Sequence, residues 1–238
     1  IDMLIKECIS QNVEINKEKK VSSLTKNQSS YIIKTNKGIH SCSSLVIATG
    51  GLSIPKIGAT DFGYRIAKQF NLKVSDLSPA LVPLTFEEKE LEFCKSLAGV
   101  SLNASVKINK IVFNEGLIFT HRGISGPSIL QISSYWNPEQ PISINLLPEL
   151  NMNLILQERR KENPKQNISN ILAGYLPNKL ALAICNKLSI NKKIGDTSNQ
   201  DLKSISDFVN NWNVIPKGTE GYKTAEVTLG GVDTKEIS

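Results

Sequence analysis

The sequence predicts a mixed α/β (α+β) fold in which a β-rich part carries a helical insertion. Residues 102–108 alternate apolar and polar side chains, which is the pattern of a strand with one buried face. Residues 151–213 repeat apolar side chains at i, i+3, i+4 and i+7, the spacing of helices that bury one face. A third sign is the short apolar run at residues 45–48, which a threonine and two glycines follow.

Residues 1–51 are expected to begin with a helix and to continue as strands. Apolar side chains between residues 3 and 9 predict the helix, and Val13 and Ile15 predict a short extended piece after it. Asn36-Lys37-Gly38 predicts a hairpin turn, because glycine adopts a positive φ without steric cost. Strands are expected at residues 21–25, 30–35, 39–41 and 45–48, the last of them buried on both faces.

A helix and a β-meander are expected next. Asp61 or Thr60 can cap a helix that ends at about Phe70, with Asn71 just past its end. A proline within residues 81–86 places this apolar, extended segment at a sheet edge or in a crossing strand. The expected meander has strands at residues 102–108, 111–113 and 117–119, with a turn at residues 114–116.

The rest of the chain is expected to be mostly helical. A glycine-rich loop at residues 121–127 leads into a helix from Pro127 to about Trp136, and residues 142–146 predict a strand. The helical insertion follows at residues 151–213, and residues 225–229 return to a strand.

Composition excludes several classes of protein. The 238 residues have a net charge of +6, and no apolar run approaches the ~18 residues of a transmembrane span. Two His, and four Cys without C-x-x-C spacing, argue against a metal site or a disulfide framework, so a cytoplasmic location is expected. Only four basic residues are Arg, and many of the 24 Lys lie in Asn/Lys-rich loops. We therefore expect no nucleic-acid partner and no membrane partner.

The first candidate site is the run at residues 45–51. A buried strand that ends in small residues lets a cofactor approach the backbone at the edge of a sheet. Thr49 offers a hydroxyl, and Gly50 and Gly51 leave space for a flat ring or a pyrophosphate. The alternative is a core strand followed by a turn that needs glycine.

The second candidate site is the loop His121-Arg122-Gly123-Ile124-Ser125-Gly126-Pro127. Its glycines and the proline that opens a helix give a helix N-terminus able to face an anion or a polarised carbonyl. His121 could donate a proton, and Arg122 could supply a fixed positive charge. The alternative is a tight structural loop with a surface histidine. Ser125 lacks the G-x-S-x-G context of a nucleophile elbow, so a hydrolase is not expected.

The third candidate site is Thr228-Leu229-Gly230-Gly231-Val232, again a strand followed by two glycines. A hairpin or a chain crossing would use the same residues. Tyr64 and Arg65, in the helix after the first glycine pair, could reach the same site. The sequence contains neither G-x-G-x-x-G nor G-x-x-x-x-G-K-[ST], so spacing alone supports no complete nucleotide site in these residues.

Taken together, five segments resemble the aminoacetone-oxidase-like (BaiN/YhiN) family of FAD-dependent oxidoreductases in order and spacing, over nearly the whole chain. These segments are residues 44–58, 62–68, 79–85, 119–127 and 225–232. The resemblance implies a partial, Rossmann-like FAD-binding domain interrupted by a β-rich domain, which a helical domain interrupts in turn. The implied limits are 1–80 for the FAD-binding domain, 81–150 plus 214–226 for the β-rich domain, 151–213 for the helical insertion, and 227–238 for the return to the FAD-binding domain. The glycine-rich segments that open and close the family's FAD site have no match here, so we expect a central fragment.

The same resemblance assigns the site residues. Those implied to bind the cofactor are Val21, Ala48, Thr49, Gly50, Gly51, Gly230 and Gly231. His121 and Arg122, the candidate catalytic residues, would face the substrate side or the domain interface. No metal ligand is expected.

The resemblance implies an FAD-dependent oxidoreductase that transfers hydride or electrons between a small organic substrate and the flavin, with NAD(P)H or oxygen as partner. Reduction of an electrophilic C=C bond and oxidation of an amine both remain open. The alternative is a truncated, non-catalytic remnant that acts at most as an interaction module. A basic RNA-binding module is a third interpretation, which rests on charge alone.

Overall fold

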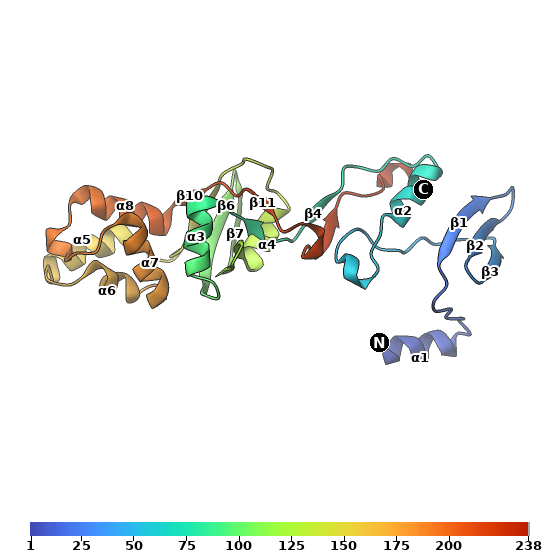
Figure 1. Ribbon diagram of the computed structural model, residues 1–238, viewed down its shortest axis with the longest axis horizontal. Coiled ribbons are helices and arrows are strands. Elements are labelled where there is room, and N and C mark those ends of the chain that lie inside the picture. Colours follow the sequence, from blue (N-terminus) through green and yellow to red (C-terminus); the bar gives the residue numbers. More distant parts are fainter. Residues whose placement is uncertain (238) are drawn as a thin grey trace. The chain divides into compact units, whose positions relative to one another are not determined.

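The computed structural model describes residues 1–237 and confirms the mixed α/β class (Figure 1). The chain divides into two compact units, one formed by residues 1–49 and the other beginning at Gly50. Each unit is described by itself. Within the described residues, no helix combines the length and the apolar character needed to cross a bilayer.

The first unit contains one helix and one three-stranded antiparallel sheet. Helix α1 spans Asp2–Ser10, and the strands are β1 (Val21–Lys26), β2 (Tyr31–Thr35) and β3 (Gly38–Cys42), in the order β1-β2-β3. Thr35 pairs with Gly38 across the expected hairpin turn, and Gly38 has a φ of 125°. The predicted helix and hairpin are therefore confirmed. Residues 13–16, where a short extended piece was expected, belong to no helix or strand.

The strand predicted at residues 45–48 is not formed in this structure. Val46 is 84% exposed and Ile47 is 40% exposed, although both were expected to be buried. None of the described strands pairs with these residues. A strand forms only where a neighbouring segment pairs with its backbone N–H and C=O groups. An apolar run indicates that burial is favourable, but it does not supply that neighbour.

A seven-stranded antiparallel sheet forms the centre of the second unit, with the strand order β10-β9-β6-β7-β8-β5-β11. The strands are β5 (Leu84–Thr85), β6 (Ser101–Ile108), β7 (Ile111–Phe119), β8 (Gly123–Ser125), β9 (Ile142–Asn145), β10 (Trp212–Val214) and β11 (Gly218–Thr219). The predicted alternation of β6 is confirmed, because Ala104, Val106 and Ile108 are buried while the residues between them are more exposed.

The meander differs from the prediction at one turn. Asn114, Glu115 and Gly116 do not form a turn, since they pair with residues 103–105 inside one continuous strand, β7. The chain turns instead at Asn109 and Lys110, where Asn109 has a φ of 52°. The full length of β6 needs pairing partners, and this requirement outweighs the local turn preference of an Asn-Glu-Gly sequence.

Six helices accompany this sheet. Two of them, α3 (Glu88–Ser96) and α4 (Pro127–Ser133), belong to the β-rich part. The helices expected between residues 151 and 213 are present as α5 (Met152–Glu162), α6 (Ile168–Ala173), α7 (Asn178–Leu188) and α8 (Asn199–Asn210). Helix α4 ends three residues earlier than expected. Helix α3 was not predicted, because only Phe93 and Cys94 of its nine residues are buried and the apolar pattern is weak.

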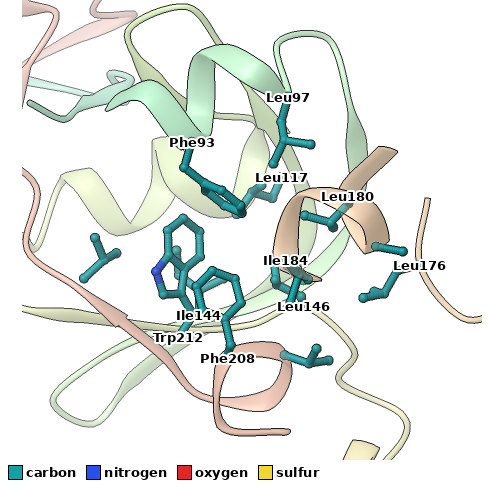
Figure 2. Close-up of a cluster of buried hydrophobic side chains, with 14 of the residues drawn as sticks. Phe93, Leu97, Leu117, Ile144, Leu146, Leu176, Leu180, Ile184, Phe208 and Trp212 are labelled. Atoms are coloured by element: carbon teal, nitrogen blue, oxygen red, sulfur yellow. The ribbon is translucent and has the colours of Figure 1, made fainter. Parts of the chain in front are cut away.

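The sheet and the helical insertion share one hydrophobic core. Figure 2 shows Phe93 of α3 and Leu97 just after this helix, near Leu117 of β7. Ile144 of β9, Ile184 of α7 and Phe208 of α8 belong to the same cluster. The ring of Phe93 lies edge-on to Phe208 of α8 and to Trp212 of β10, at centroid distances of 5.5 and 5.6 Å. These contacts hold the β-rich part and the helical insertion together.

A smaller group of elements carries the glycine-rich segments. It contains α2 (Phe62–Gln69), β4 (Ser78–Ala80) and β12 (Val227–Leu229), with the single-turn helices η1 (Pro55–Ile57) and η3 (Gly221–Lys223). Strands β12 and β4 pair antiparallel, so the return to a strand expected near residue 225 is confirmed. Asn71 follows α2 with a φ of 60°, as expected for a residue just past a helix end.

Candidate functional site

Two of the predicted glycine segments are joined through Thr228. The backbone N–H groups of Leu52 and Ser53 donate hydrogen bonds to the Thr228 hydroxyl, at 2.9 and 3.2 Å. The Ser53 hydroxyl lies 3.1 Å from the same oxygen. Thr228 is the middle residue of β12, which ends directly before Gly230. The segment after the first glycine pair is therefore fixed to the strand that precedes the second pair.

Gly51 is needed for close packing. A Cβ atom at this position would lie 2.7 Å from the Thr228 hydroxyl oxygen and 2.8 Å from the Tyr64 hydroxyl oxygen. Any larger residue would have to displace one of these side chains. The structure therefore brings Tyr64 into the same place, as the sequence suggested. Arg65 instead pairs with Asp61 at 3.0 Å and contributes nothing here.

The second glycine pair is held by the segment that follows α2. The Gly231 N–H donates to the Ser75 hydroxyl at 3.0 Å, and the Ser75 N–H donates to the Gly231 carbonyl at 2.9 Å. Gly230 has a φ of 86°, and a Cβ there would overlap the Asp76 carbonyl oxygen. This crossing of two chain segments is the alternative that the sequence left open for Gly230.

Gly50 and Gly231 differ from their neighbours, because their backbones face open space. Both have a positive φ, and a Cβ on either would meet no protein atom within 4 Å. Gly50 is also exposed to solvent. The same open space lies beside Gly38, Gly58, Gly99 and Gly221, so the cofactor role of Gly50 and Gly231 stays a prediction. Gly51 and Gly230 would shape the site, since the protein itself fills the space beside them.

Two tyrosines lie beside this glycine region. The carbonyl of Tyr222 in η3 accepts a hydrogen bond of 2.8 Å from the Ile54 N–H, which ties η3 to the loop after Gly51. Burial raises the pKa of the Tyr222 hydroxyl, and the neighbouring Tyr64 raises it further. Tyr222 therefore stays a neutral hydrogen-bond donor. Tyr222 was not predicted as a site residue, because a lone Tyr after a glycine has no recognisable pattern.

His121 and Arg122 lie in an exposed turn between β7 and β8. The Thr120 hydroxyl accepts hydrogen bonds from the N–H groups of Arg122 and Gly123, at 3.2 and 3.1 Å. The Arg122 carbonyl accepts from the Phe86 N–H at 3.0 Å, so the backbone of the turn is fixed. Among the described residues, no hydrogen bond or ion pair joins either side chain to the glycine segments. Their catalytic role stays a prediction.

Three predicted cofactor residues belong to the first unit. Val21 begins β1 and is half-buried, whereas Ala48 and Thr49 are exposed. The cofactor role of all three remains a prediction.

Comparison with known proteins adds the family. Residues 78–227 match the model described as the HI0933-like protein barrel and H2TH domain. The chain belongs to the HI0933-like family. The matched region contains the seven-stranded sheet and the helices α3 to α8.

Three curated relatives of this HI0933-like protein align with the whole chain. The "Ribosomal RNA dihydrouridine synthase" proteins of Escherichia coli (strain K12) and of Haemophilus influenzae are 44% and 40% identical to it, and the chain covers 60% and 61% of their lengths. The "3-dehydro-bile acid delta(4,6)-reductase" of Clostridium scindens is 25% identical, with 61% of its length covered. The chain thus spans about three fifths of these relatives. They do not confirm the aminoacetone-oxidase-like part of the resemblance.

Proposed function

We propose that this chain is part of a flavin-dependent reductase that acts on a uracil base of ribosomal RNA. The observation on which this rests is its identity of 44% and 40%, over its whole length, to two proteins named ribosomal RNA dihydrouridine synthase. The glycine segments near Thr228 support a cofactor site, because Gly50 and Gly231 offer open backbone.

The names of the relatives point to one kind of reaction. Dihydrouridine is uridine whose C5=C6 bond has been saturated, so its formation needs a hydride and a proton. The more distant relative is also named a reductase. Both names therefore favour reduction of a C=C bond over oxidation of an amine. FAD, when bound, supplies the hydride, and NAD(P)H is the proposed source of electrons.

The residues of this chain would bind the cofactor and orient the substrate. Gly50 and Gly231 would allow the cofactor to approach the backbone, and Thr228 would hold the two segments in register. His121 is the proposed proton donor to the ring carbon that does not receive the hydride. Arg122 would hold an RNA phosphate or the uracil carbonyl that is conjugated with the reacting bond.

This proposal replaces two expectations from the sequence. The sequence predicted a small organic substrate, and we propose a base within RNA instead. It also predicted no nucleic-acid partner, and we propose that RNA is one. The net charge of +6 is compatible with an anionic polymer. A small-molecule substrate remains the second candidate, which the 25% identity to a bile acid reductase favours.

Cofactor binding is tested first by an absorbance spectrum between 300 and 550 nm. The purified chain is measured before and after addition of FAD and again after desalting. Flavin bands that stay with the protein support the cofactor site in these residues. A colourless, folded protein would favour the non-catalytic alternative for the chain alone.

The reaction is tested in a chimera in which this chain replaces the matching segment of the Escherichia coli relative. The chimera receives FAD, NADPH and ribosomal RNA, and mass spectrometry of the nucleosides measures a gain of two hydrogens per modified uridine. We expect dihydrouridine from the chimera and at least a hundredfold less from its His121→Ala variant. Dihydrouridine formation that does not depend on His121 would remove its role as proton donor. A chimera that holds FAD but leaves RNA unchanged would reject the RNA substrate.

A further inference from the structure

The helical insertion has a basic edge, which consists of two stretches. One is the end of α5 with the following connection (residues 159–167), and the other is the later part of the α7–α8 connection with the start of α8 (residues 192–201). These two stretches contain six basic and three acidic side chains. They also contain two of the four arginines of the whole chain, Arg159 and Arg160. The guanidinium group of arginine can donate two hydrogen bonds to one phosphate. The presence of two arginines on this edge therefore favours a phosphate ligand.

Backbone hydrogen bonds hold the two connections side by side. The Ile194 N–H donates to the Gln166 carbonyl and the Gly195 N–H donates to the Pro164 carbonyl, both at 2.9 Å. Asn167 and Lys193 form an antiparallel bridge between the same segments. The chain can approach so closely because residue 195 is a glycine, whose Cβ would lie 2.8 Å from the Pro164 oxygen. Lys165 and Lys193 are therefore presented on a fixed frame.

The charges on this edge divide into paired and unpaired groups. Arg159 pairs with Glu162 at 3.2 Å, and Lys192 pairs with Asp201 at 2.8 Å. Arg160 donates to the Asn199 amide oxygen at 2.7 Å and keeps its charge unbalanced. Lys161, Lys165 and Lys193 are exposed, and no ion pair is recorded for them among the described residues. The remaining acid, Asp196, is exposed as well.

We infer that this basic edge binds the phosphate backbone of RNA and so brings the substrate to the enzyme. The inference rests on the proposed RNA substrate and adds to it a docking surface on the helical insertion, outside the glycine segments. Lysines that neutralise RNA phosphates release the counterions condensed on the RNA, and this release favours binding. Such contacts do not depend on the base sequence. The neighbouring amides of Asn163, Gln166 and Gln200 suit hydrogen bonds to phosphate and ribose oxygens.

The test measures binding of the chain to a fluorescein-labelled RNA of twenty uridines by fluorescence anisotropy, between 50 and 200 mM salt. The variant is Lys165→Gln/Lys193→Gln, and the matched control is Lys107→Gln/Lys110→Gln on the exposed hairpin of β6 and β7. Each lost phosphate contact to a single strand should lower the salt slope by about 0.7. The edge variant should therefore bind roughly 25-fold more weakly at 0.1 M salt, and the control should bind like the unaltered chain.

The outcomes separate this inference from the proposed function. Equal loss in the edge and control variants, or no loss in the edge variant, overturns the edge as a docking surface even if flavin binds and RNA is reduced. Loss confined to the edge variant supports the edge even if no flavin binds. A Lys161→Gln/Lys193→Gln variant provides a second reading, with the same expected loss. Binding to phosphatidylserine vesicles but not to RNA would assign the edge to a lipid surface and overturn the inference.

Discussion

The Thr228 hydroxyl accepts a hydrogen bond of 2.9 Å from the backbone N–H of Leu52, a residue 176 positions earlier in the chain. The same oxygen accepts from the Ser53 N–H at 3.2 Å. One side chain thus satisfies two backbone donors of an irregular loop and joins the two glycine segments. The geometry of the candidate cofactor site depends on this contact.

Replacement of Thr228 by valine should loosen the glycine region. Valine has the shape of threonine without the hydroxyl, so two partly buried N–H groups lose their acceptor at a cost of about 1–3 kcal/mol. Hydrogen exchange at the Leu52 and Ser53 amides should become faster, which NMR or mass spectrometry can measure. Thr228→Ser keeps the hydroxyl and is the control. Unchanged exchange in Thr228→Val would show that the contact does not hold the loop.

Gly51→Ala should destabilise the same region by steric overlap. The new Cβ would lie 2.7 Å from the Thr228 oxygen, so Thr228 or Tyr64 must move. Gly218→Ala is the matched control, because its Cβ would be 3.6 Å from the nearest atom, in ordinary contact. We expect a loss of roughly 1–3 kcal/mol for Gly51→Ala by overpacking and little change for Gly218→Ala. Equal urea midpoints for the two variants would contradict the packing around Gly51.

Gly230→Ala separates backbone strain from steric overlap. Gly230 and Gly58 have similar φ values of 86° and 98°, but only Gly230 lies against another backbone, at the Asp76 carbonyl. Alanine in a left-handed conformation costs about 1–2 kcal/mol, and both variants should show this loss. Gly230→Ala should lose more, because the crossing with residues 75 and 76 must open. Chemical unfolding of both variants measures the difference.

The sequence predicted those elements whose pattern is set locally. The hairpin at Gly38 and the helices of the insertion follow from turn chemistry and apolar spacing, and both are present. The seven-stranded order of the sheet could not be predicted, because strands β5, β10 and β11 have two or three residues and gain their pairing from distant segments. The polar helix α3 was missed for a similar reason, since its few buried residues form no clear stripe.

The candidate site was predictable in its residue types and not in its contacts. Paired glycines after apolar runs marked residues 50–51 and 230–231, but the same signal also suggested a buried strand before Gly50 that the structure does not form. Nothing local to Thr228 indicates that it contacts Leu52, because Leu52 lies 176 positions earlier in the chain. His121 and Arg122 remain candidates by chemistry alone.

Alkaline pH should destabilise the core through Cys94. Burial and the nearby Glu90 raise the pKa of this thiol to about 12 from its ordinary 9.0, while Lys187 lowers it. Between these values the folded protein keeps a proton that the unfolded chain releases. The free energy of unfolding therefore falls as pH rises above 9, by up to about 1.4 kcal/mol per pH unit.

Cys94→Ala isolates this effect. Between pH 8 and pH 11 the variant should lose on the order of 2 kcal/mol less stability than the unaltered chain, as measured by guanidinium unfolding at each pH. Cys42→Ala, in the first unit, is the control and should keep the original pH dependence. Parallel curves for Cys94→Ala and the unaltered chain would exclude Cys94 as the source of the alkaline loss.

The aromatic cluster around Phe93 predicts that the sheet and the helical insertion unfold together. Phe93 contacts Phe119 of the sheet and Phe208 of α8, with centroid distances of 6.0 and 5.5 Å, so neither part can expose its core alone. Phe93→Leu should lower the free energy of unfolding by roughly 1–3 kcal/mol, through a lost ring contact and a small cavity. Phe62→Leu is the control, because Phe62 of α2 is only half-buried, and it should lower the free energy of unfolding by less.

Two probes in a Trp136→Phe background test this cooperativity. Fluorescence then reports on the buried Trp212, and circular dichroism at 222 nm reports mainly on the helices. The Trp212 ring packs against Phe208 of α8 and Phe119 of β7, at centroid distances of 5.4 and 6.2 Å. We therefore expect both signals to change at one urea midpoint and to shift together in Phe93→Leu. Loss of the helical signal at a lower urea concentration than the Trp212 signal would mean that the insertion is an independent domain. The shared core would then contribute packing without coupling the two parts.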